Sequence, residues 1–88
     1  MNASAVAAWM LSRLSDEGCL YQDDVVDFLV TKKSEDLLRE NADGNLAIGA
    51  GVLTAFKKLT PDNVVWVRPD FYWRFRVDED EEGREARG

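Results

Sequence analysis

The sequence contains no histidine and a single cysteine, Cys19. Without histidine the chain lacks the commonest general base and metal ligand at neutral pH. A lone cysteine cannot form an intrachain disulfide framework. Because Cys19 has no histidine to act as its base, we interpret it as a small buried hydrophobe and not as a nucleophile. We therefore expect a protein that is not an enzyme, with no catalytic residue and no cofactor.

A long apolar run is also absent. The opening MNASAVAAWML has no positive region before it and is too short for a convincing signal peptide or membrane span, so we expect a first helix there and a cytoplasmic protein. The net charge is −6, and residues 77–88 (VDEDEEGREARG) hold six acids and two arginines. This segment contributes −4, which leaves −2 for residues 1–76. The expected domain is therefore nearly neutral.

Two segments at the start and in the second half of the chain have apolar residues at helical spacing. The first predicts a helix over residues 4–17, with Ser4 as its cap and Gly18 ending it in the left-handed conformation. The other predicts a helix over residues 50–59, closed before Pro61 because proline disfavours the α conformation in the preceding residue.

A further helix is expected after a short extended piece at residues 19–21. Asp23 or Asp24 can cap this helix. We interpret these two residues and Asp27 as capping and first-turn charge rather than as a cation site, so no metal is assigned.

The stretch SEDLLRENADGNLAI, residues 34–48, has two interpretations. Asp43-Gly44 is typical of a turn that joins two short extended segments. Residues 34–36 could equally cap a helical turn that continues to Leu38. The sequence leaves both open.

The stretch NVVWVRPDFYWRFR predicts a hairpin. Residues 64–68 and 71–77 are rich in β-branched and aromatic side chains and bracket Pro69-Asp70. Alternation in the second strand predicts one face in the core and one facing water or a partner. The expected core side holds Phe71, Trp73, Phe75 and Val77, and the outer side holds Tyr72, Arg74 and Arg76.

The register of this hairpin depends on its turn. A two-residue type I turn would splay the strands and no glycine is available for a bulge, so we favour a four-residue loop, which keeps Arg68 opposite Phe71. That connection places Trp66 opposite Trp73 on the buried side and Arg74 outside near Val65. A slip by one residue would move Trp66 to the outer face.

The order helix, extended piece, helix, third helix and hairpin resembles a winged helix-turn-helix. The segments GCLYQ, GNLAI and VVW…YWR also resemble a family of small uncharacterised bacterial proteins over about residues 5–76, a kind of family often carried by phages or integron cassettes. The resemblance implies an α+β, winged-helix-like domain with three helices, a C-terminal hairpin and a short extra extended segment over residues 1–76. The acidic run beyond Val77 lacks apolar side chains to bury, so residues 77–88 are expected to be a disordered acidic tail.

A winged helix commonly binds DNA, with its third helix in the major groove. The candidate contacts are then Thr54, Lys57, Lys58 and Arg68. The third helix offers no arginine, asparagine or glutamine to contact base edges, and a nearly neutral domain with an anionic tail is poorly matched to a polyanion. We therefore hold DNA binding as the alternative hypothesis.

The main hypothesis is a non-catalytic interaction domain that binds another protein or its own copy, without membrane contact. One interpretation of the aromatic residues is purely structural, with a core formed by Trp9, Phe28, Phe56, Trp73 and Phe75. The other is an exposed patch rich in the residue types that dominate binding hot spots. The candidate interaction surface consists of Trp66, Arg68, Tyr72, Arg74 and Arg76.

Overall fold

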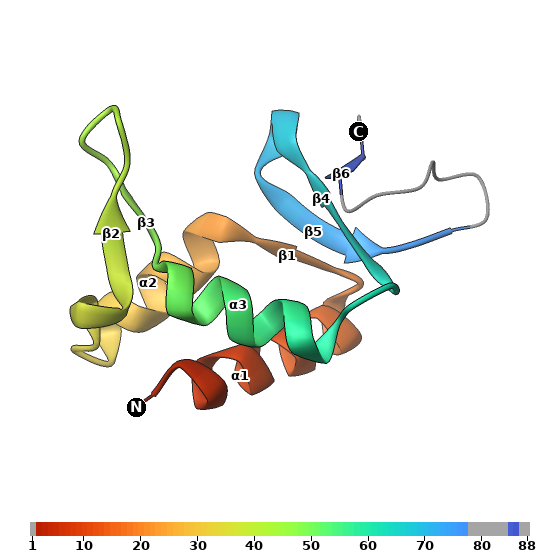
Figure 1. Ribbon diagram of the computed structural model, residues 1–88, viewed down its shortest axis with the longest axis horizontal. Coiled ribbons are helices and arrows are strands. Elements are labelled where there is room, and N and C mark those ends of the chain that lie inside the picture. The colour runs from red at the N-terminus through yellow and green to blue at the C-terminus, as the bar shows by residue number, and fades with distance from the viewer. Residues whose placement is uncertain (1, 78–84, 87–88) are drawn as a thin grey trace.

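The computed structural model describes residues 2–77 and 85–86, whose order of helices and strands confirms the expected α+β class (Figure 1). The elements are α1 (Ala3–Glu17), β1 (Cys19–Tyr21), α2 (Gln22–Thr31), the 3-10 helix η1 (Glu35–Leu37), β2 (Leu38–Glu40), β3 (Leu46–Ile48), α3 (Ala50–Leu59), β4 (Val64–Val67), the 3-10 helix η2 (Arg68–Asp70), β5 (Tyr72–Phe75) and β6 (Glu85–Ala86).

Two sheets carry the strands. One has the strand order β1-β5-β4-β6, and β2 and β3 form a separate antiparallel pair. Helices α1 and α3 pack against each other along their lengths, and the β2–β3 and β4–β5 hairpins both project from the same side of this helical layer (Figure 1). This arrangement leaves a space between the hairpins that the candidate site occupies.

The core lies between the helices and the inner face of the larger sheet. Of the five aromatic residues expected there, Phe56 and Trp73 are buried, and their rings meet edge to face with centroids 5.5 Å apart. Trp9, Phe28 and Phe75 are only partly buried and pack against the core from its edge. Trp9 and Phe28 stack on each other with ring centroids 3.8 Å apart.

The first helix ends as predicted but begins differently. Gly18 has φ 80° and donates its backbone N–H to the Leu14 carbonyl over 2.8 Å. The predicted cap Ser4 is wrong, because the helix already begins at Ala3 and the Oδ1 atom of Asn2 accepts a hydrogen bond from the Ala5 N–H over 2.8 Å. Asparagine is as good a cap as serine, so the start moves by one residue without loss.

The second helix also begins earlier than expected. Tyr21 still pairs with Tyr72 in the sheet, and the helix starts at the next residue, Gln22. Strand therefore passes into helix without a loop, and the expected aspartate cap is wrong. Asp23 and Asp24 lie in the first turn of the helix, where negative charge is favourable. The third helix, Ala50–Leu59, matches its prediction.

The two extended segments of the middle stretch and their turn are confirmed. The helical turn is also present, but it is shorter than expected, because Leu38 already belongs to β2 and Ser34 makes no side-chain cap. Residues 35–37 form the helical turn η1, and the turn around Gly44, at φ 78°, joins β2 to β3. Asn41 stabilises this turn, since its Oδ1 atom accepts hydrogen bonds from the backbone N–H groups of Asp43 and Asn45 over 2.9 and 3.0 Å.

The C-terminal hairpin has the favoured register. Trp66 lies opposite Trp73, and Val65 lies opposite Arg74. Two residues expected in the core are instead exposed, Phe71 by 56% and Val77 by 51%. Phe71 has a left-handed backbone at φ 54°, which breaks the strand alternation, and Val77 lies beyond the last residue of β5.

The outer face of this hairpin is less open than the alternation predicts. Val65 and Val67 are fully buried, and Arg74 opposite Val65 is only partly exposed. Cys19 pairs with Arg74 at the sheet edge and is half-buried, so the expectation that it is a buried hydrophobe is wrong.

The expected disordered tail falls mainly on residues 78–84 and 87–88, which lie outside the described residues. Within the same stretch, Glu85–Ala86 form β6, which pairs in parallel with β4 so that Glu85 lies beside Trp66. None of the described helices has the length and apolar character needed to cross a membrane.

Candidate functional site

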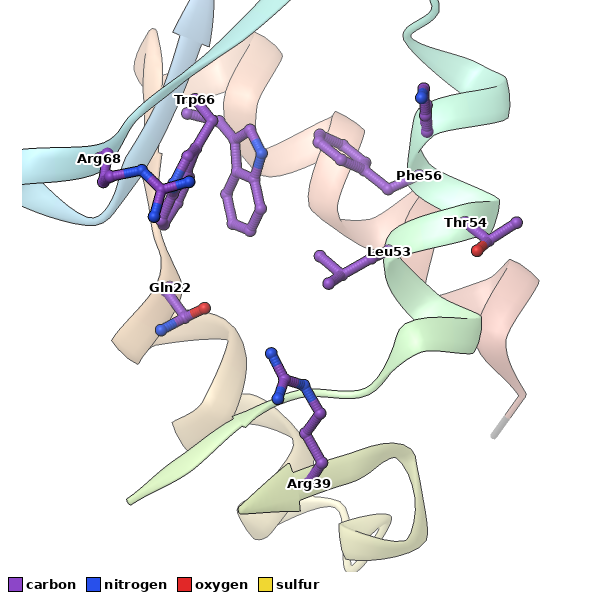
Figure 2. A pocket seen from close by; sticks show the side chains of 9 residues that line it. Gln22, Arg39, Leu53, Thr54, Phe56, Trp66 and Arg68 are labelled. Atoms are coloured by element: carbon purple, nitrogen blue, oxygen red, sulfur yellow. The ribbon is translucent and has the colours of Figure 1, made fainter. Parts of the chain in front are cut away.

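A pocket of about 480 Å³ opens between the two hairpins, with α3 and the start of α2 as its walls (Figure 2). Figure 2 shows Arg39 reaching into it from β2, Gln22 from α2 and Leu53 from α3. The lining residues are Gln22, Arg39, Leu53, Thr54, Phe56, Lys57, Trp66, Arg68 and Trp73.

The apolar part of this pocket is an aromatic cluster. The rings of Trp66 and Trp73 lie 4.5 Å apart, as their cross-strand pairing dictates, and Trp73 also meets Phe56. Trp66 is only half-buried, whereas Trp73 and Phe56 belong to the core. A partly exposed indole fixed on a rigid strand presents a flat apolar surface to a ligand.

The polar part of the pocket is positively charged. Arg39, Lys57 and Arg68 line it, and none of the described residues that line it is a carboxylate. In the part of the chain that the structure describes, the exposed side chains of Arg39 and Lys57 make neither an ion pair nor a hydrogen bond. Cations without a counter-charge beside a concave apolar surface favour an anionic ligand. We call this pocket the cationic end.

A second pocket of about 460 Å³ lies between the tips of the same hairpins. None of the described residues that line it is basic, and two of them are aspartates. The lining residues are Tyr21, Gln22, Asp23, Asn41, Asn45, Leu46, Asp70 and Phe71. Three of these residues are exposed large hydrophobic residues, Tyr21 at 46%, Leu46 at 46% and Phe71 at 56%. We call this pocket the acidic end.

Gln22 lines both pockets, so they adjoin at this residue, and we refer to the two pockets together as the groove. Its backbone N–H donates to the Phe71 carbonyl over 2.9 Å, which ties the start of α2 to the tip of the β4–β5 hairpin. Its side-chain amide, half-buried, makes no hydrogen bond with the described residues. A donor and an acceptor are therefore available midway along the groove.

The candidate interaction surface is divided by the structure. Trp66 and Arg68 line the cationic end, whereas Tyr72, Arg74 and Arg76 line neither end of the groove. The Nε atom of Arg76 donates to the Asp62 carbonyl over 2.9 Å, at the opposite end of the hairpin from its tip.

The candidate DNA contacts are brought together more closely. Thr54, Lys57 and Arg68 all line the cationic end, although Thr54 points away from Arg39 in Figure 2. Lys58 lines a separate pocket of about 320 Å³ between α1 and α3. Arg39 and Gln22 belong to the groove but were not among the candidates. Nothing in the sequence pattern marks either residue. A single arginine in a short strand, or a glutamine at the start of a helix, gives no indication of the element that it will face.

Among residues 2–77 and 85–86, no group of three acidic, histidine or cysteine side chains is placed to hold a metal ion. The described residues form a small α+β domain whose groove is lined by basic side chains at one end and by aspartates at the other. The chain belongs to the family of unknown function DUF6953, whose model matches residues 2–75. No curated protein and no solved structure matches the chain.

Proposed function

We propose that this protein is a non-catalytic binding domain that acts by association with another protein, through the groove between its two hairpins. The observation that carries the proposal is the row of exposed large hydrophobic residues at the acidic end, Tyr21, Leu46 and Phe71, which continues to the half-buried Trp66. Aromatic residues and arginine are enriched at protein interfaces, and exposed apolar patches on a small domain mark such sites.

The conformation of Phe71 supports the same function. A left-handed backbone is unfavourable for a residue with a side chain, by about 1–2 kcal/mol. Here it directs a phenylalanine outward, where its ring meets Trp66 edge to face with centroids 6.1 Å apart. Residues held in an unfavourable backbone conformation cluster at binding and active sites, which supports a binding role for this ring.

The test compares two charge reversals, one in strand β2 and one in helix α3. Arg39→Glu changes the cationic end, and Lys58→Glu makes the same change of charge outside the groove. Partner proteins captured by the wild-type chain should be lost with Arg39→Glu and kept with Lys58→Glu. Light scattering of each variant over a range of concentrations would show whether the partner is a second copy. If capture and self-association are equal for both variants, the groove is not the binding surface.

DNA binding is the second candidate, favoured by the position of Thr54, Lys57 and Arg68 around one pocket together with Arg39. The order of the elements and the pairing of β1 with β5 also support a winged-helix-like interpretation. The acidic end argues against it, since Asp23 and Asp70 would repel a polyanion that followed the groove.

A titration with labelled duplex DNA at low salt tests this candidate. Binding that weakens with rising salt and with Lys57→Ala would support it. The absence of any change in anisotropy at low salt would remove it.

A further inference from the structure

The two ends of the groove differ in charge, and this difference restricts the partner. The following inference rests on the proposed function, because it assumes that the groove binds protein. It concerns the kind of partner segment that fits the groove and the order of the charged residues along that segment.

The cationic end fits an acidic side chain next to an apolar one. Arg39 and Lys57 are exposed and without ion pairs among the described residues, and both line the same pocket as the half-buried Trp66. A carboxylate reaching these two cations would lie beside the indole, so an apolar neighbour in the same segment could cover the ring.

The acidic end fits the opposite charge. Asp23 and Asp70 are exposed and make no ion pair within the described part of the chain, and Tyr21 and Phe71 line the same pocket. Lysine and arginine side chains combine an apolar stem with a charged head. They can therefore lie against aromatic rings while the head meets a carboxylate.

Gln22 joins the two ends. Its side-chain amide has a carbonyl and an NH₂ group without a hydrogen-bond partner among the described residues, and it lines both pockets. An extended peptide presents a backbone N–H and a C=O of the same kind, so one residue of such a segment can satisfy both groups. A helix would not, since its backbone groups already bond to each other.

We propose that the groove binds an extended segment of a partner protein that carries an acidic residue at the Arg39 and Lys57 end and a basic residue at the Asp23 and Asp70 end, with its backbone on Gln22. An extended chain advances about 3.3 Å per residue, so about eight residues are enough to cross a domain whose middle dimension is 27 Å.

The test begins with random displayed peptides of about eight residues, selected on the full chain. The selected sequences should share one acid and one base at a constant separation, with apolar neighbours. A synthetic peptide of the selected sequence then gives affinities by fluorescence anisotropy for the wild type and for Arg39→Gln and Asp70→Asn. Lys58→Gln and Asp16→Asn serve as controls, since both residues are exposed and line neither end of the groove.

The expected result is a matched pattern of losses. Arg39→Gln should weaken binding about fivefold, and no further loss should follow when the peptide acid is replaced by its amide. Asp70→Asn should behave in the same way toward the peptide base. The two control variants should bind as the wild type does.

Two results would overturn the inference and have different meanings for the proposed function. The charge order is refuted if the selected peptides share no common order of charge. It is also refuted if the affinity lost with Arg39→Gln depends on the peptide base instead of the peptide acid. Either result leaves the groove as a protein-binding site. A selection that enriches no peptide would refute an extended segment as ligand. The proposed function would then be decided by the capture experiment with Arg39→Glu.

Discussion

Gly49 precedes α3 at the point where the β2–β3 hairpin meets the helix, and its replacement by alanine should weaken the fold. A Cβ atom at this position would lie 2.5 Å from the Leu37 carbonyl oxygen, whereas ordinary contact begins at 3.4 Å. The obstacle is backbone, not a flexible side chain. The carbonyl would therefore have to retreat by roughly 0.9 Å.

This movement affects a hydrogen bond at the base of the β2–β3 hairpin, one step beyond the pairing of Leu38 with Ile48. The Gly49 N–H donates to the same Leu37 carbonyl over 2.8 Å. Losing that bond costs about 1 kcal/mol, and crowding adds about 1–3 kcal/mol. The reduced freedom of the unfolded chain offsets less than about 1 kcal/mol. We expect Gly49→Ala to lower the free energy of unfolding by about 2 kcal/mol, which corresponds to a fall in Tm of about 8–16 °C.

Gly51 provides the matched control. It lies in the first turn of α3, where a Cβ atom would meet only the Ala3 Cβ at 3.9 Å, an ordinary contact. Alanine is favoured over glycine within a helix by up to about 1 kcal/mol, so Gly51→Ala should raise Tm by a few degrees. Thermal and urea unfolding followed by circular dichroism measure both. If the two variants shift stability in the same direction, the close approach at Gly49 is not what requires glycine there.

Three further predictions concern single side chains. Asn2→Ala should lower the free energy of unfolding by about 1 kcal/mol, because the Oδ1 atom of Asn2 caps α1. Ser4→Ala should change it by less than about 0.5 kcal/mol, and equal losses for the two variants in urea unfolding would contradict this. Phe56→Ala should cost about 3–5 kcal/mol, measured in the same way, because a fully buried ring is removed from the core, and a loss below about 1 kcal/mol would contradict its position. Phe71→Asn should leave Tm within a few degrees, since relief of the left-handed strain offsets the lost contact with Trp66, yet it should abolish peptide binding in the anisotropy assay; a large fall in Tm with unchanged binding would assign the ring a structural role.

Much of the local structure could be predicted from sequence patterns. The helix over residues 50–59 and its closure before Pro61 follow from apolar spacing and proline geometry, and both are observed. The register that pairs Trp66 with Trp73 follows from the four-residue loop between the strands. A shift of one residue would move every side chain of a strand to the other face of the sheet. These predictions succeeded because each depends on neighbours within one element or one turn.

The groove could not be predicted in the same way. Arg39 and Trp66 are far apart in the sequence, and they line one pocket only because the β2–β3 hairpin packs against α2 and leads directly into α3. The base of that hairpin depends on a close approach at Gly49, which no periodicity reveals. The outward turn of Phe71 was missed for a related reason, since strand alternation assumes a strand backbone and this residue leaves it.

The passage from β1 into α2 without a loop has a consequence for how the molecule responds to force. Tyr21 is held in the sheet by Tyr72, and the next residue, Gln22, is the first residue of a helix while its N–H still reaches the Phe71 carbonyl. Because no loop separates these elements, a force applied to the hairpin tip has two possible effects. Either α2 tilts together with the hairpin, or the hydrogen bond of the Gln22 N–H breaks. The hydrogen-exchange rate of the Gln22 amide therefore reports whether the junction moves as one rigid unit or opens locally.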